Sequence, residues 1–239
     1  MRPDEHQTTT DNAPTLSTVK KALDVLEHVI AAKDTVGVTE VARAVDINPS
    51  TVYRVLTTFK EYGFVEQDEN NRYYAGMGLL RLVGPLLARL EPRKVARPIL
   101  ERLARETGES ANLMVPDGDQ GVYVDSVQGT QSIRMVVDIG KREEYHCSAV
   151  GKAILAHLPE QTFKRLAERG FTRFTPKTIT DASLLSVHLR LISEQGYAID
   201  DEEGEEGTRC VGAPLFNGAG EIVGGISLAG PAFRMSMSR

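Results

Sequence analysis

Apolar residues recur at spacings of three and four positions along the first third of the chain, which is the period of an amphipathic helix. The first such stretch predicts a helix over residues 16–33. Its apolar positions fall on one helical face and are Leu16, Val19, Leu23, Leu26 and Ile30. A second, shorter stretch predicts a helix over residues 40–45, and Thr39 is placed to cap it.

A third helix is predicted over residues 49–60, because its start carries two signals. Asn48 is a favourable cap residue, and Pro49 suits the first helical position, where a missing N–H costs nothing. Gly63 is a natural stop after this helix. The second and third helices are therefore joined by a tight turn over residues 46–48.

The third helix is followed by two short segments that predict strands, at residues 64–67 and 72–75. The polar residues 68–71 between them predict the turn of a hairpin. Residues 77–90 predict one more apolar helix. Glu91-Pro92 interrupts it, and we place the boundary between two domains there.

The second half of the chain mixes helices with strands that follow one another in hairpins. We predict helices over 94–106, 149–157, 161–169 and 183–195, and strands over 112–115, 122–126, 133–137, 197–200, 210–216 and 221–228. This order predicts an α+β domain with a largely antiparallel sheet.

Composition limits the class of protein. The chain has 239 residues, of which 41% are hydrophobic and 26% charged, as in an ordinary globular protein. No apolar run approaches the roughly 18 to 20 residues of a membrane helix, and the polar start, residues 1–15, is expected to be a disordered tail rather than a secretory signal. The two cysteines, Cys147 and Cys210, fit reduced thiols. We expect a cytoplasmic protein that needs no membrane and no cofactor.

The formal net charge of −5 argues weakly against a protein coated with nucleic acid. It leaves room for a local basic surface, because phosphate binding depends on local charge. Between residues 43 and 60, Arg43, Arg54 and Lys60 outnumber the single acid Asp46.

Three helices followed by a hairpin are the order of a winged helix-turn-helix. The N-terminal end of a recognition helix enters the major groove, so it needs small polar and cationic side chains there. Arg54 suits a bidentate contact to guanine or a phosphate clamp. The candidate DNA-binding residues are Lys20, Lys21, Thr39, Ser50, Thr51, Tyr53, Arg54, Thr57 and Arg72. A small helical bundle that contacts a protein with the same geometry is the alternative.

Several longer motifs resemble one family over nearly the whole chain. They are KALDVLEHV, TEVARAVDINPSTVYRVLTTFKEYGFVEQD, HCSAVGKAILA (146–156), GYAIDDEEGEEGTRCVGAPLF (196–216) and ISLAGPAFR (226–234). In this order they are similar to the IclR family of bacterial transcriptional regulators. The resemblance implies a winged helix-turn-helix over 16–76, a linker helix over 77–92 and a GAF-like effector-binding domain over 93–239. It further implies dimers, often paired into tetramers, that bind a palindromic operator and control catabolic operons.

The same resemblance implies an effector pocket. Its residues would be Ala149 and Val150, through their backbone, together with Asp200, Cys210 and Ser227. Ala229 stands where relatives often have serine, so one hydroxyl donor is missing. The pocket suggests a small organic acid or an aromatic metabolite. Asp200 would repel a carboxylate unless it were protonated, so we interpret it as an orienting group or as the acceptor of a ligand hydroxyl.

An enzyme is one alternative. Gly151-Lys152 fails the P-loop pattern, because His146 stands where that pattern needs glycine. His146, Cys147 and Asp200 have the residue types of a nucleophilic triad. Neighbouring residues of an extended segment point to opposite faces, however, so His146 and Cys147 are poor partners. We therefore expect no catalytic activity.

A metal-responsive regulator is the other alternative. His146, Cys147, Asp200 and Cys210 are zinc-ligand types. No closely spaced pair of ligands occurs among them, so we predict no metal site. The acidic run over 200–206 is expected to be a solvated loop.

Overall fold

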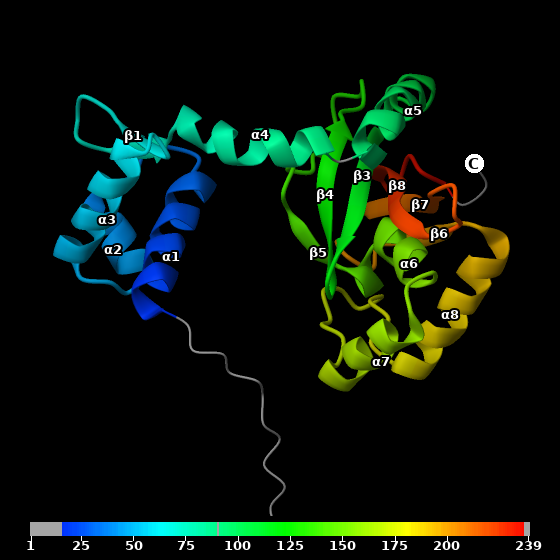
Figure 1. Cartoon of the computed structure of the whole chain (residues 1–239). Coiled ribbons are helices and arrows are strands. Elements are labelled where there is room, and N and C mark those ends of the chain that lie inside the picture. Colours follow the sequence, from blue (N-terminus) through cyan, green and yellow to red (C-terminus); the bar gives the residue numbers. More distant parts are fainter. Residues whose placement is uncertain (1–15, 90, 237–239) are drawn as a thin grey trace, which may run out of the picture. The chain divides into compact units, whose positions relative to one another are not determined.

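The computed structural model describes residues 16–89 and 91–236. The chain divides into two compact units, one ending at Ala88 and one starting at Arg89 (Figure 1). The predicted tail, residues 1–15, and Leu90 at the end of the predicted linker helix lie outside the described residues. No helix among the described residues is long and apolar enough to cross a membrane.

The N-terminal unit has the predicted order of elements. Its helices are α1 (Ser17–Ala31), α2 (Val38–Ala44) and α3 (Pro49–Glu61), followed by the strands β1 (Val65–Gln67) and β2 (Tyr73–Ala75). The two strands pair antiparallel, with Glu66 opposite Tyr74. The short 3-10 helix η1 (Met77–Leu79) then leads into α4 (Leu80–Arg89). The winged helix-turn-helix is therefore confirmed.

The helix predicted at residues 16–33 exists, but the face assigned to the core is wrong. Val25 and Val29 are buried, and Leu26 packs beside them. Leu16, Val19, Leu23 and Ile30 remain between 45% and 73% exposed. The helix carries apolar residues on more than one side, and contact with α2 and α3 selects the side of the valines.

The caps are partly as predicted. Asn48 caps α3, since its Oδ1 accepts a hydrogen bond from the N–H of Ser50 at 2.9 Å. Gly63 ends the helix with a φ of 71°. The cap assigned to Thr39 is wrong, because α2 begins earlier and Gly37 is its cap residue. The Glu40 carboxylate reaches back to the N–H of Gly37 at 2.9 Å and stabilises this helix start.

The C-terminal unit is built on a six-stranded sheet with the order β5-β4-β3-β8-β7-β6, in which every neighbouring pair is antiparallel. The strands are β3 (Ser110–Asp117), β4 (Gln120–Val127), β5 (Arg142–Glu144), β6 (Ala198–Asp201), β7 (Thr208–Phe216) and β8 (Ile222–Pro231). The helices are α5 (Glu91–Thr107), η2 (Tyr145–Cys147), α6 (Ala149–Leu155), α7 (Glu160–Arg169) and α8 (Ala182–Gln195). The α+β class with a largely antiparallel sheet is confirmed.

Helices cover both faces of this sheet (Figure 1). Leu113 of β3 packs with Leu100 of α5 in one cluster of buried residues. Its neighbour Met114 packs with Ile154 of α6 and Leu185 of α8 in another. Successive strand residues point to opposite faces, so the sheet lies between α5 and the layer that contains α6 and α8.

The strand predicted over 133–137 is wrong. These residues belong to an irregular connection between β4 and β5, and β5 itself was not predicted. Side chains hold the connection in place of a strand ladder. Ser110 Oγ donates to the Met135 carbonyl, and Arg234 donates to the Ile133 carbonyl at 2.7 Å. Of the alternating apolar residues that predicted a strand, Met135 and Val137 are partly buried, whereas Ile133 is exposed.

Candidate functional site

The N-terminal half of α3 presents polar side chains to solvent above a buried apolar face. Four of the predicted contact residues lie here and all are exposed: Ser50, Thr51, Tyr53 and Arg54. Beneath them, Val52 and Leu56 are fully buried in the core of the unit. A helix held from below in this way leaves its front end free to meet a partner.

Two of the predicted contact hydroxyls on α3 are already hydrogen-bonded locally. Ser50 Oγ donates to Asn48 Oδ1 at 2.8 Å, and Thr57 Oγ1 donates to the Tyr53 carbonyl at 2.9 Å. The Arg54 side chain has no hydrogen-bond or ion-pair partner within the described part of the chain. Its guanidinium therefore keeps its donors for an external acceptor.

The other predicted DNA contacts are spread over α1 and α2. Lys20 and Lys21 are exposed on α1, and Thr39 is exposed in the first turn of α2. Arg43 adds an exposed cation near the end of α2. Their roles in DNA binding stay predictions.

Arg72 has an internal partner that the sequence did not indicate. Its guanidinium donates to the Thr35 carbonyl at 2.6 Å and to Glu40 Oε2 at 2.8 Å. Hydrogen bonding to Arg72 lowers the pKa of the Glu40 carboxyl. The side chain thus ties the hairpin to the start of α2, and a DNA contact by Arg72 would have to compete with these bonds.

All five residues predicted for the effector pocket line one small cavity of about 130 Å³ in the C-terminal unit. They come from the start of α6 (Ala149, Val150), the end of β6 (Asp200) and the middle of β7 and β8 (Cys210, Ser227). Ala229 also lines the cavity. Further lining residues that the sequence did not indicate include Asn112, Tyr123, Met135, Val136, Val137, Lys141, Glu143 and Thr208.

Backbone donors stand at the α6 side of the cavity. Ser148 Oγ accepts a hydrogen bond from the N–H of Gly151 at 3.1 Å, which occupies the third amide of the helix. The first two, of Ala149 and Val150, have no hydrogen-bond partner among the described residues. Gly212 of β7 lies against this helix start, where a Cβ would come within 2.6 Å of the Val150 nitrogen. A larger residue at this position would displace the two amides.

Strands β3 and β8 add two polar side chains that line the cavity and have hydrogen-bonding groups without a partner among the described residues. Asn112 and Ser227 are opposite each other on β3 and β8, and both are buried. Asn112 Oδ1 accepts from Ser126 Oγ at 2.8 Å. The Asn112 amide NH₂ and the Ser227 hydroxyl have no partner in the described part of the chain, so they are available to a ligand.

Asp200 is one of the acids that line the cavity. Its Oδ1 accepts a hydrogen bond from the N–H of Glu203 at 2.7 Å. Burial outweighs this bond and raises the pKa of Asp200 from 3.8 to about 6. Burial also raises the pKa of the Cys210 thiol well above its usual value. Asp200 therefore takes up a proton readily when negative charge approaches, whereas Cys210 remains a neutral thiol.

The opposite wall carries a second acid. The Tyr123 hydroxyl donates to Glu143 Oε2 at 2.6 Å, and Lys141 Nζ donates to Glu143 Oε1 at 3.1 Å. Burial and the nearby Glu143 raise the pKa of Tyr123. Both carboxylate oxygens of Glu143 thus have a partner, and Lys141 balances its charge.

His146 and Cys147, which the enzyme and metal alternatives share, each have a backbone partner. His146 Nε2 lies 2.8 Å from the Thr172 carbonyl, and Cys147 Sγ donates to the Glu144 carbonyl at 3.3 Å. Burial raises the pKa of the Cys147 thiol above the ordinary range. Among the described residues, no three His, Cys, Asp or Glu side chains are grouped so that they could hold a metal ion.

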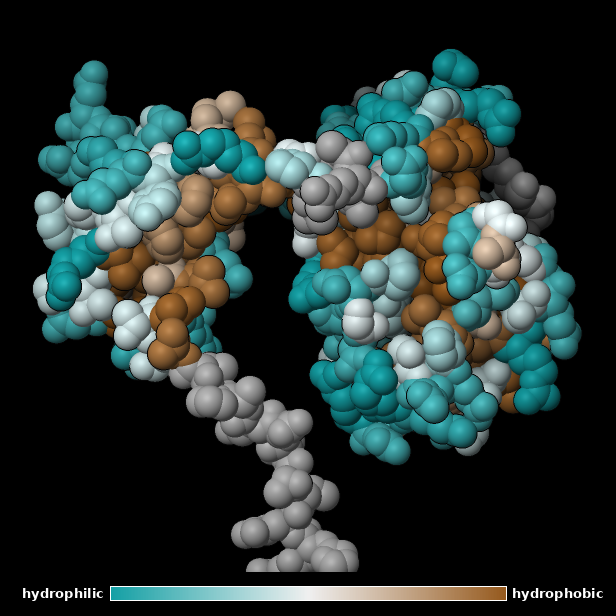
Figure 2. Space-filling view, viewed as in Figure 1, coloured by the Kyte–Doolittle hydropathy of each residue, from teal (hydrophilic) through white to brown (hydrophobic). Residues whose placement is uncertain are grey.

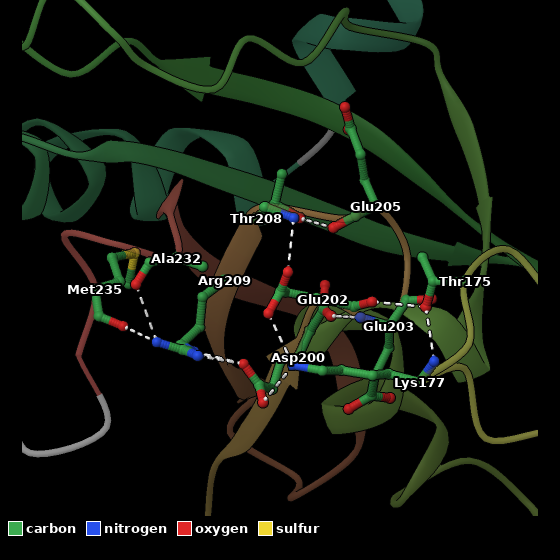
Figure 3. A network of polar contacts seen from close by, with 12 residues as sticks. Thr175, Lys177, Asp200, Glu202, Glu203, Glu205, Thr208, Arg209, Ala232 and Met235 are labelled. Carbon is green, nitrogen blue, oxygen red and sulfur yellow. Dashed lines mark hydrogen bonds and ion pairs between the residues drawn. The ribbon is translucent and has the colours of Figure 1, made fainter.

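The acidic run is only in part the solvated loop that its composition predicts: Glu205 and Glu206 are exposed, whereas the first acids of the run are partly or fully buried. Figure 3 shows its side chains in a network of polar contacts. Lys177 Nζ donates to Glu202 at 2.7 Å, and Arg209 donates to Asp201 at 2.8 Å. Glu203 is buried. Arg209 follows the run closely in sequence, whereas Lys177 and the Lys152 partner of Glu203 are distant, so the local pattern does not indicate them.

Two family models together match nearly the whole described chain. The model for the IclR helix-turn-helix domain matches residues 18–69, and the model for the bacterial transcriptional regulator IclR C-terminal matches residues 85–239.

Individual relatives agree with these matches. The HTH-type transcriptional regulator BhcR of Paracoccus denitrificans is 39% identical over 92% of this chain and 79% of its own length. The crystal structure of the Thermotoga maritima IclR has a TM-score of 0.78 and is 35% identical, over 92% of this chain and 90% of that one. An IclR homologue from Microbacterium hydrocarbonoxydans, solved in complex with 4-hydroxybenzoate, has a TM-score of 0.80 at 22% identity, over 90% and 89%. This last likeness supports the fold.

Proposed function

The chain belongs to the IclR family of bacterial transcriptional regulators, and from this premise we propose how its parts divide the work. It is a DNA-binding transcription regulator with a C-terminal effector-binding domain, as its relatives are, and not an enzyme. In our proposal residues 16–76 bind the operator, residues 77–92 link the domains and residues 93–239 bind the effector. The protein would act in the cytoplasm on a catabolic operon.

One observation carries the DNA-binding role: the front of α3 is exposed, capped and fixed from below. The Arg54 guanidinium has no partner among the described residues, and Ser50 and Thr51 lie about one helical turn before it. A helix with these features fits the major groove, where arginine makes bidentate contacts to guanine. Lys20 and Lys21 would add phosphate contacts that orient the domain.

The cavity favours a small hydroxy acid as the effector. Two free amides, the Ser227 hydroxyl and the Asn112 NH₂ are donors for a carboxylate, and Asp200 is an acceptor for a hydroxyl on the neighbouring carbon. A volume of about 130 Å³ suits a small acid, either aliphatic with a few carbons or with a single ring. Because the Microbacterium relative was solved with 4-hydroxybenzoate, we include an aromatic acid among the compounds to be tested.

A dimer would supply two recognition helices for the two halves of a palindrome. The N-terminal unit has an apolar surface that its own core does not cover (Figure 2). Six residues on α1, η1 and α4 are more than half exposed: Leu16, Val19, Leu23, Met77, Leu80 and Leu82. Exposed apolar sets of this kind are typical of protein interfaces, so we assign the dimer contact to this surface.

The effector would act by population shift. It can favour one arrangement of the paired recognition helices only to the extent that it binds that arrangement more tightly. Direct catalysis has no part in this mechanism.

The proposal is tested by operator binding in the presence of small acids. An operator is selected from random-sequence DNA with the wild-type protein, and binding is followed by fluorescence anisotropy. Arg54→Ala is expected to weaken operator binding at least tenfold, since a good bidentate contact contributes about 1–3 kcal/mol. Arg190→Ala, an exposed arginine on α8, is the matched control and should bind like wild type.

The same assay then titrates lactate, pyruvate, glycolate and 4-hydroxybenzoate. At least one acid should change the operator affinity of the wild type and of Arg190→Ala. Equal operator affinity of Arg54→Ala and wild type at matched salt would remove Arg54 from the reading surface. The absence of any response to hydroxy or oxo acids would contradict the effector class while leaving DNA binding intact.

A further inference from the structure

A lysine and a glutamate are buried together beside the effector cavity without lining it. Lys152 of α6 is 1% exposed and Glu203 is 8% exposed. Lys152 Nζ donates to both carboxylate oxygens of Glu203 and to the Ile199 carbonyl at 2.7 Å. The ammonium group therefore has all three of its hydrogen bonds satisfied inside the protein.

Stability alone gives a weak reason for this ion pair. Taking two charges out of water costs about as much as their attraction returns, and apolar residues of similar size often fold as well. Removing one partner is a different matter, because it leaves a buried charge alone. A buried pair that adds little net stability can still fix the geometry of the elements it joins.

The pair joins two walls of the cavity. Lys152 lies one turn after Ala149 and Val150, which line the cavity and whose amides have no hydrogen-bond partner among the described residues. Glu203 follows Asp200 by three residues, and its N–H donates to Asp200 Oδ1 at 2.7 Å. A displacement of Glu203 would thus turn the Asp200 carboxyl, while a displacement of Lys152 would shift the amides.

The outer side of the same loop is held by separate contacts. Thr178 Oγ1 donates to the Glu203 carbonyl at 2.6 Å, and Thr175 Oγ1 donates to the Glu202 carbonyl at 2.7 Å. Lys177 pairs with Glu202 at the surface (Figure 3). The two threonine hydrogen bonds do not involve the inner ion pair, and we expect them to keep the loop folded when that pair is removed. The geometric role of the pair can therefore be tested separately from folding.

We propose that Lys152 and Glu203 are positioning residues for the effector: their ion pair holds the amides of Ala149 and Val150 at a fixed distance from Asp200, so that one small ligand can contact both. The proposal rests on the effector occupying this cavity. Lys152 and Glu203 would thus determine which length of ligand binds, although neither residue lines the cavity.

The test compares Lys152→Met, Glu203→Met and the double variant in the full-length protein, with Lys177→Met as control. The single variants each leave one buried charge and should lower the Tm. The double variant removes both charges and should recover most of this decrease in Tm. Amide hydrogen exchange of the segments with Ala149, Val150 and the 203–204 amides is measured by mass spectrometry without ligand, and lactate and pyruvate binding by calorimetry.

In the double variant we expect at least tenfold faster exchange of these segments and at least tenfold weaker binding of whichever acid the wild type binds. Operator affinity and the Lys177→Met control should stay within twofold of wild type. A double variant that recovers Tm, exchange and acid affinity together would show that the pair only packs the core and would overturn the proposal. If the wild type binds neither acid, the proposed effector class fails, and the exchange rates still decide whether the pair positions the cavity walls.

Discussion

At the scale of single residues, Asp200 is an acid whose surroundings work against its charge. It lies at the end of β6, where it is 3% exposed, and its pKa is raised from 3.8 to about 6. Between these two values the folded chain binds a proton that the unfolded chain has released. The free energy of unfolding therefore falls as the pH rises from about 4 to about 6. Above that range the buried carboxylate destabilises the domain.

Asp200→Asn is expected to raise the free energy of unfolding at pH 7.5 by about 1–3 kcal/mol, because a pKa shift of one unit corresponds to about 1.4 kcal/mol. The gain should shrink as the pH is lowered from 6 toward 4. Urea unfolding followed by circular dichroism at several pH values measures it. Asp201→Asn is the control of opposite sign, because hydrogen bonding to Arg209 lowers the pKa of Asp201. A loss of stability in Asp200→Asn at every pH would mean that its hydrogen bond to Glu203 outweighs its desolvation.

The residue scale also shows what a sequence can predict of the site. Family motifs marked five residues that do line one cavity: Ala149, Val150, Asp200, Cys210 and Ser227. Their roles as ligand contacts stay predictions. Other lining residues come from β3, β4 and the connection to β5, whose segments carry no motif. Partners distant in sequence were not predictable either, since no local pattern pairs a lysine of α6 with a glutamate of the acidic run.

At the scale of elements, periodicity predicts whether a helix exists better than it predicts which face is buried. The helix at residues 16–33 was predicted with its exposed side as the core, because Leu16, Val19 and Leu23 share a face that only an additional partner would cover. The segment at 133–137 has the alternation of a strand without strand neighbours. Contacts with residues distant in sequence determine both the buried face of the first helix and the conformation of residues 133–137. A local sequence pattern does not reveal such contacts.

The joint between α3 and α4 is an element-scale feature with a testable requirement. The N–H of Gly78 donates to the Gly63 carbonyl at 2.8 Å, so the start of η1 lies directly on the end of α3. A Cβ at Gly78 would come within 2.5 Å of that carbonyl oxygen and 2.7 Å of the Tyr62 carbonyl oxygen. Both obstacles are backbone atoms, so they cannot rotate away.

Gly78→Ala is therefore expected to destabilise the N-terminal unit by about 1–3 kcal/mol, the usual cost of overpacking, and to weaken operator binding. Gly84→Ala on α4 is the matched control: nothing lies within 4 Å of its added Cβ. Its stability should stay within about 1 kcal/mol of wild type, because Pro85 restricts the residue before it and offsets the helix preference of alanine. Urea unfolding and fluorescence anisotropy on the selected operator measure the two effects. A stable, fully binding Gly78→Ala protein would mean that this joint adjusts freely.

At the scale of the whole molecule, acidic residues outnumber basic ones, 33 to 28, yet the protein must approach a polyanion. Some of the acidic side chains form ion pairs within the protein, as Glu40 does with Arg72 and Glu202 with Lys177. The exposed cations Lys20, Lys21 and Arg54 remain for DNA. Each phosphate that such a cation neutralises releases counterions, so binding weakens with salt in proportion to the number of these contacts.

Salt dependence consequently distinguishes phosphate contacts from base contacts. The double variant Lys20→Gln, Lys21→Gln should weaken binding equally on the selected operator and on unrelated DNA. It should also flatten the plot of log affinity against log salt by about one unit for each phosphate that the variant no longer neutralises. Arg54→Ala should instead lose affinity mainly for the operator, with little change of slope, if its guanidinium binds guanine. Anisotropy titrations between 50 and 200 mM salt, a range over which about 6–10 phosphate contacts change affinity by at least a thousandfold, measure both slopes. A flattened slope with unchanged discrimination in Arg54→Ala would assign Arg54 to the backbone and leave base recognition to Ser50, Thr51 and Tyr53.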